Sequence, residues 1–194
     1  MNDTIKMIVV LSVITGLSGL TLAGLRQATA TPIEEQVLAN VQSPVLKQVL
    51  AGCDNDPVKE RKKIAGPDGK PVTVFPAKKG GMLYAVAFEI MGKGYGGELG
   101  VITGFDVAAD TCLNIGVTTS KETPGLGSRV AEESFTKKFR RHTLDKIALR
   151  SSGGDIDGIA GATVSSTGVV NAVSRAAEVY KALKPQILKE FSAG

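Results

Sequence analysis

Four hydroxyl side chains lie close together in the segment DGIAGATVSSTGVV, at positions 157–170. They belong to Thr163, Ser165, Ser166 and Thr167. Gly158 and Gly161 precede them, and apolar residues then recur every three or four positions until Pro185. Because this spacing is typical of a helix, we expect the hydroxyl groups at a helix N-terminus and the end of that helix at Pro185.

A helix N-terminus of this kind is suited to binding an anion. Its first backbone N–H groups have no partner within the helix, and the helix dipole places partial positive charge there. Residues 161–166 are therefore candidates for holding a phosphate. The alternative is an N-cap, in which Ser165 or Ser166 closes the helix. One cap accounts for only one hydroxyl group, and these residues alone leave both interpretations open.

A second segment, SKETPGLGSR at positions 120–129, has the composition of a fixed turn. Pro124 sets one backbone angle, and Gly125 and Gly127 permit tight bends, so the segment needs no function of its own. As one wall of a ligand site, however, its backbone amides and the Leu126 side chain are suited to border a flat aromatic ring.

Together, ETPGLG (122–127) and DGIAGATVSS (157–166) resemble the FMN-binding domain that is shared by the G subunit of the Rnf electron transport complex and the C subunit of the sodium-pumping NADH:quinone reductase. The resemblance extends over the whole chain, and the modest length of 194 residues favours the Rnf branch. It implies that Thr163 is joined to the phosphate of FMN by a phosphoester, formed by a flavin transferase that moves FMN from FAD. Ala160 departs from the family pattern, which usually has Ser or Thr there.

The resemblance also implies which residues surround the cofactor. Beside Thr163, the residues expected to bind FMN are Glu122, Thr123, Gly125, Leu126, Gly127, Asp157, Gly161, Ala162, Val164, Ser165 and Ser166. Neither a catalytic residue nor a metal ligand is expected in this chain, because turnover would belong to the whole complex.

The implied function is that of an electron-transfer subunit in a membrane complex that couples ferredoxin:NAD electron transfer to ion translocation. The chain would then be part of an oxidoreductase and translocase, with the other Rnf subunits (A, B, C, D and E) as partners and the flavin transferase as a partner during maturation. Two alternatives stand beside it. One is a membrane-anchored flavoprotein that passes electrons to extracellular acceptors outside any Rnf complex. The other is a non-redox binding domain whose hydroxyl cluster is only a cap.

The N-terminal segment has the length of a membrane span. Residues 7–25 carry no charge, and a helix needs about 20 apolar residues to cross a bilayer. A cleavable signal peptide is the alternative, since QATATP at 27–32 resembles a cleavage site, but the apolar run exceeds a usual signal core. We expect a single-pass anchor in a bacterial or archaeal cytoplasmic membrane, with the C-terminal domain on the extracytoplasmic side.

Composition argues against nucleic acid as a partner. The net charge is only +4, and the chain has six Phe, three Tyr and no Trp, so a basic surface interleaved with aromatic residues is not expected. Cys53 and Cys112 lack the spacing of a metal site, and the sequence leaves open whether they pair. The one histidine, His142, follows two arginines and is expected at the surface.

The remaining pattern predicts an α+β fold, in which one N-terminal transmembrane helix is followed by a mostly antiparallel sheet packed with helices. Apolar runs and turn residues predict strands at 72–75, 82–91, 98–107, 112–118 and 146–149. Helical spacing predicts a connector at 33–50, kinked or divided at Pro44, and a helix at 128–141.

The expected organisation has three parts. Residues 1–31 form the transmembrane anchor, residues 32–64 a helical connector, and residues 65–194 the extracytoplasmic FMN-binding domain. Within the last part, the glycine-rich segment GKGYGGE at 92–98 predicts a hairpin with a wide tip, because its four glycines permit backbone conformations closed to other residues.

Overall fold

The computed structural model describes residues 3–192. The chain divides into two compact units, Met1–Asn40 and Val41–Gly194. The first unit contains α1 (Asp3–Val37), an unbroken helix that buries none of its residues. Its residues 7–25 are uncharged, and an apolar helical stretch of this length that buries nothing against its own chain is typical of a membrane span. Within the described residues, one helical stretch, Asp3–Val49, is long and apolar enough to cross a membrane.

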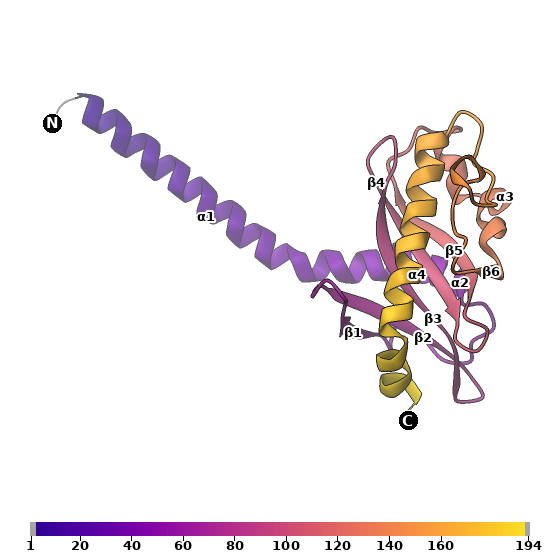
Figure 1. Cartoon of the computed structure of the whole chain (residues 1–194). Coiled ribbons are helices and arrows are strands. Elements are labelled where there is room, and N and C mark those ends of the chain that lie inside the picture. Colours follow the sequence, from indigo (N-terminus) through magenta and orange to yellow (C-terminus); the bar gives the residue numbers. More distant parts are fainter. Residues whose placement is uncertain (1–2, 193–194) are drawn as a thin grey trace. The chain divides into compact units, whose positions relative to one another are not determined.

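The second unit is built on a six-stranded antiparallel sheet, in the order β1-β2-β3-β4-β5-β6 (Figure 1). Its strands are β1 (Lys62–Ala65), β2 (Pro71–Lys79), β3 (Met82–Lys93), β4 (Glu98–Asp106), β5 (Thr111–Ser120) and β6 (His142–Thr143). The four strands predicted between 72 and 118 are confirmed as β2 to β5. They are joined by short connections, so sequential strands are neighbours.

One long helix, α4 (Thr163–Ser192), lies along one face of this sheet and packs mainly on β3 and β4 (Figure 1). Tyr180 of α4 stacks on Phe105 of β4, with ring centroids 4.5 Å apart. Phe105 in turn stacks on Phe88 of β3. These rings, together with the buried Val and Ala residues of α4, form the main hydrophobic core.

The short helix α2 (Ser43–Val49) packs on β4 and β5. It reaches the sheet through Gly104 and Gly116, where a Cβ atom would come within 2.7 Å of Val49 and 2.2 Å of Val45, respectively. Because neighbouring residues of a strand point to opposite faces and Phe105 faces α4, α2 covers the other face. The sheet is therefore enclosed between two helices, and the predicted fold class is confirmed.

Three secondary-structure predictions are wrong in part. The helix expected at 128–141 is a series of short turns, Gly127–Ala131, α3 (Glu133–Thr136) and Lys137–Phe139, because the backbone is extended at Glu132 (ψ 150°). The strand expected at 146–149 reduces to one bridge between Leu149 and Ile156. The last helix continues past Pro185 to Ser192.

The connector is divided near the expected proline. A π-helical segment, Leu38–Gln42, separates α1 from α2. Pro44 lies in the first turn of α2, where it needs no helical hydrogen-bond acceptor.

The histidine and the two cysteines are also placed by the structure. His142 is less exposed than expected, because its side chain is only 11% exposed and its Nε2 atom is hydrogen-bonded to Asp155 Oδ1 at 2.6 Å. Cys53 and Cys112 are both free thiols.

Candidate functional site

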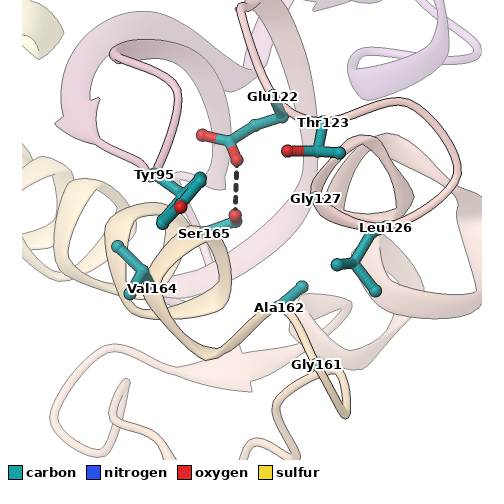
Figure 2. Close-up of a pocket in the computed structure, with 9 residues that line it drawn as sticks. All are labelled: Tyr95, Glu122, Thr123, Leu126, Gly127, Gly161, Ala162, Val164 and Ser165. Carbon is teal, nitrogen blue, oxygen red and sulfur yellow. Dashed lines mark hydrogen bonds between the residues drawn. The ribbon is translucent and has the colours of Figure 1, made fainter.

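A cavity of about 420 Å³ lies where three segments of the chain meet (Figure 2). The segments are the loop between β3 and β4, the turn that follows β5, and the first turn of α4 with the residues before it. The lining residues are Tyr95, Glu122, Thr123, Leu126, Gly127, Gly161, Ala162, Val164 and Ser165. Its size is within the range of small-molecule and cofactor sites.

Glu122 is the link between the three segments. Its carboxylate is buried, with one oxygen, Oε2, accepting a hydrogen bond from the Ser165 hydroxyl at 2.6 Å (Figure 2). The other oxygen, Oε1, accepts a bond from the Gly96 backbone N–H at 3.2 Å. Because a buried carboxylate is stable only when hydrogen-bonded, these bonds hold the β3–β4 loop and the start of α4 against the turn.

Glycines make room for this carboxylate on two sides. A Cβ atom on Gly94 would lie 2.0 Å from Glu122 Oε1, and one on Gly127 would lie 2.4 Å from Oε2. A Cβ on Gly96 would lie 1.9 Å from the backbone oxygen of Lys121. At these positions the glycines therefore serve close approach of the backbone.

The predicted turn at 122–127 is held by its own hydrogen bonds. The backbone N–H groups of Leu126 and Ser128 both donate to the Thr123 carbonyl at 3.2 Å, and the Gly125 N–H donates to Ser128 Oγ at 3.0 Å. Gly125 adopts the left-handed conformation, with φ of 73°. The turn presents Leu126, which remains 42% exposed and reaches the chain at Gly161.

The four hydroxyl groups at the start of α4 differ in what they bind. Ser165 donates to Glu122, Ser166 Oγ accepts from the Ile159 N–H at 3.0 Å, and Thr167 donates to the Thr163 carbonyl at 2.8 Å. The Thr163 hydroxyl has no hydrogen-bond partner among residues 3–192, and its side chain is exposed. Of the four, Thr163 alone therefore offers a hydroxyl group that is accessible and not already used.

The backbone at this helix end also leaves donors available. Ser166 is the first residue of α4 whose N–H bonds to the preceding turn, to the Ala162 carbonyl at 2.9 Å. The N–H groups of Thr163, Val164 and Ser165 make no hydrogen bond within the described part of the chain. No acidic residue lies in the first turn of α4, so its positive end is available to an anion.

The structure brings together most, but not all, of the residues predicted around the cofactor. Gly125 and Ser166 do not line the cavity, although each makes a hydrogen bond that shapes its wall. Thr163 does not line the cavity either, but it lies between the lining residues Ala162 and Val164. Asp157 is directed elsewhere, because its carboxylate pairs with Arg150 at 3.1 Å.

Tyr95 lines the cavity but is not among the residues that the sequence predicts there. The one sequence feature that singles out Tyr95 is its position as an aromatic residue between the four glycines of GKGYGGE. By itself that segment predicts only a hairpin tip, because the contact that brings the loop to the cavity, through Glu122, spans 26 residues of sequence.

Comparisons with known proteins identify relatives of this chain. A family model described as the FMN-binding domain matches residues 94–178, which include all three segments of the cavity. The chain is 33% identical over 181 residues to the G subunit of an ion-translocating oxidoreductase complex from Cereibacter sphaeroides, covering 88% of this chain and 81% of that protein. It is 28% identical over 187 residues to the protein of the same name in Methanosarcina acetivorans, covering 93% and 96%. The fold is similar to that of Shewanella oneidensis NqrC, with a TM-score of 0.53 at 20% identity over 66% of this chain and 67% of that one.

Proposed function

Because the chain belongs to the family of G subunits of ion-translocating oxidoreductase complexes, we propose that it carries FMN covalently on Thr163 and relays electrons between other subunits of such a complex. Family membership and the FMN-binding domain make it an electron-transport subunit of an ion-translocating complex. The covalent bond, the coupling to ferredoxin:NAD electron transfer and the identity of the neighbouring subunits belong to the proposal.

The observation that carries the proposal is the state of the Thr163 hydroxyl. A flavin transferase needs a hydroxyl group that it can reach and that is not committed to the fold. Thr163 meets both conditions, whereas Ser165, Ser166 and Thr167 are each engaged in hydrogen bonds. The free N–H groups of the first turn lie beside it and are suited to bind a phosphate once it is attached.

The residues of the cavity then have separate roles. The first turn of α4 binds the phosphate, while Thr123, Leu126 and Val164 form the walls beside the ring system. Glu122 acts as a positioning residue, since its oxygens are occupied by Ser165 and Gly96. FMN supplies one- and two-electron redox chemistry, and the protein's part is to fix and tune it.

A covalent bond suits a relay that is anchored in the membrane. Attachment prevents loss of the cofactor between turnovers, and α1 retains the domain at the membrane surface. We place the domain on the extracytoplasmic side of a bacterial or archaeal cytoplasmic membrane. NADH and ferredoxin would react at the other Rnf subunits, because no segment of this chain predicts a site for either.

The test of the complex is purification from native membranes through a tag on this chain. We expect the flavinylated chain to bring with it the other Rnf subunits and a ferredoxin:NAD oxidoreductase activity. Recovery of the flavinylated chain without those subunits, together with reduction of an added extracellular acceptor, would overturn this part of the proposal.

A further inference from the structure

The β3–β4 loop presents one large aromatic side chain at the rim of the cavity. Tyr95 lines the cavity, yet 76% of its surface is exposed. Its ring therefore does not stabilise the hydrophobic core. Leu126 and Val164 line the same cavity and are 42% and 51% exposed. Three exposed apolar side chains around one opening mark a binding surface more than a solvated one.

The loop that bears Tyr95 is held in place. A hydrogen bond of 2.8 Å from the Gly94 N–H to the Gly97 carbonyl closes it, and the Gly96 N–H is bonded to Glu122. Gly94 and Gly96 pack so closely on residues 121 and 122 that neither position has space for a Cβ atom. The backbone on both sides of Tyr95 is therefore fixed against the same carboxylate that holds Ser165.

Tyr95 and Leu126 stand on opposite sides of the Glu122–Ser165 hydrogen bond (Figure 2). Val164, which follows the proposed attachment residue Thr163, lies on the side of Tyr95. A planar group tethered at Thr163 and lying in the cavity has the Tyr95 ring within its reach. Aromatic rings favour offset-stacked or edge-to-face contact with other aromatic systems, and Tyr95 is the only aromatic residue among the described residues that line the cavity.

We infer that Tyr95 packs against the isoalloxazine ring of the attached FMN and shields it from solvent. The inference rests on the proposed function, because it requires a flavin tethered at Thr163. Tyr95 is then a cofactor-contacting residue, and its contribution is made by the face of its ring. The phenolic hydroxyl is not required, so phenylalanine should replace it.

The test measures how readily iodide quenches the fluorescence of the attached flavin in the full-length, detergent-solubilised protein. Wild type is compared with Tyr95→Ala, Tyr95→Phe and the control Met82→Ala. Met82 is 75% exposed at the tip of the β2–β3 hairpin and does not line the cavity. Flavin content is determined first, by absorbance of the denatured protein, so that loss of attachment is separated from loss of shielding.

We expect Tyr95→Ala to raise the iodide quenching constant about twofold, because one face of the ring system loses its cover. Tyr95→Phe and Met82→Ala should keep the wild-type value. Should Tyr95→Ala not be flavinylated, Tyr95→Ser, which also removes the ring and leaves that face uncovered, gives the same comparison.

Two results would overturn the inference while leaving the proposed function intact. One is a flavinylated wild type whose quenching constant equals that of Tyr95→Ala. The other is a Tyr95→Phe protein that behaves like Tyr95→Ala, which would assign the effect to the hydroxyl group. A wild-type protein without attached flavin would instead refute the proposed function itself.

Discussion

The carboxylate of Glu122 and the hydroxyl of Ser165 form a buried hydrogen bond of 2.6 Å, although 43 residues separate them in the sequence. Through this bond the turn after β5 and the first turn of α4 become two sides of one cavity. The second carboxylate oxygen binds the β3–β4 loop. The site is therefore assembled around one buried carboxylate. The contribution of its hydrogen bonds to the stability of the fold can be measured by mutation.

Removing this bond should destabilise the fold. In a double-mutant cycle with Glu122→Ala and Ser165→Ala, we expect a coupling energy of about 1.5–3 kcal/mol, because hydrogen bonds to charged groups contribute this much when buried. Urea unfolding of the detergent-solubilised chain, followed by circular dichroism, measures it.

An exposed pair of the same residue types provides the control. Ser134 donates to Glu132 at 3.3 Å at the surface, where competition with water reduces the net contribution of a hydrogen bond. Its coupling energy should be below about 0.5 kcal/mol. Equal coupling energies in the two pairs would show that the Glu122–Ser165 bond does not hold the site together.

The close packing of the glycine loop gives a second prediction. Gly94→Ala should lower the free energy of unfolding by about 1–3 kcal/mol, because its Cβ atom would overlap Glu122 Oε1. Gly158→Ala is the matched control, since its Cβ atom would meet its nearest neighbour at 3.6 Å, an ordinary contact. If both variants unfold at the same urea concentration, the loop is not packed against Glu122.

Much of this arrangement is predictable from the sequence, for local reasons. Strands β2 to β5 are short apolar runs between turn residues, and the start of α4 follows from the change to helical spacing after Gly161. The end of α4 cannot be predicted from the sequence in this way. Pro185 suggests an end, but it removes only one backbone donor from the helix. Ile187 and Phe191 remain buried beyond it, so tertiary packing continues the helix.

Other features depend on contacts between distant segments. Strand β1 has the basic sequence KKIA, and only Ile64 is buried in it; its pairing with β2 provides the rest of its stability. The place of Tyr95 depends on Glu122, and no local pattern pairs the two residues. The sequence predicts Glu122 as a flavin ligand, whereas its proposed role as a positioning residue rests on bonds that only the folded chain shows.

The two thiols should differ in reactivity. Cys112 is fully buried, and burial raises the pKa of its thiol to about 12, so almost no thiolate exists at about pH 8. Cys53 is partly exposed, and burial raises the pKa of its thiol as well. We expect a maleimide at about pH 8 to label the native protein at Cys53 and to label Cys112 only after denaturation.

The variants Cys53→Ser and Cys112→Ser assign each labelled site. Native labelling of the Cys53→Ser protein at the rate of the denatured chain would show that Cys112 is accessible in the folded protein.

Acid should weaken one surface cluster. The Lys184 side chain donates a hydrogen bond to Asp110 and, with Tyr180, lowers the pKa of that carboxyl below its ordinary value of 3.8. A carboxyl whose pKa is lowered on folding stabilises the fold above its unfolded pKa, and this contribution disappears as the pH falls through the folded pKa.

Asp110→Asn is the matched variant, because asparagine also tolerates the left-handed conformation that Asp110 adopts, with φ of 52°. At neutral pH the variant should be less stable than wild type by at most about 1 kcal/mol, since the Asp110 carboxylate is 54% exposed. Urea unfolding at a series of pH values should show this difference shrinking below pH 3.8 and vanishing under the folded pKa. A difference that stays constant as the pH falls from about 7 to about 2.5 would contradict the assignment.

The most direct test of the central claim is mass spectrometry of the denatured protein after co-expression with a flavin transferase. Trypsin should release residues 151–175 as one peptide, which contains both Thr163 and Thr167. We predict that this peptide carries FMN in the wild type and that Thr163→Ala carries none. Thr167→Ala should also carry FMN, because in the wild type the Thr167 hydroxyl already donates a hydrogen bond to the Thr163 carbonyl. An unmodified wild-type peptide from flavin-replete cells, or FMN retained in Thr163→Ala, would contradict the assignment of Thr163 as the attachment residue.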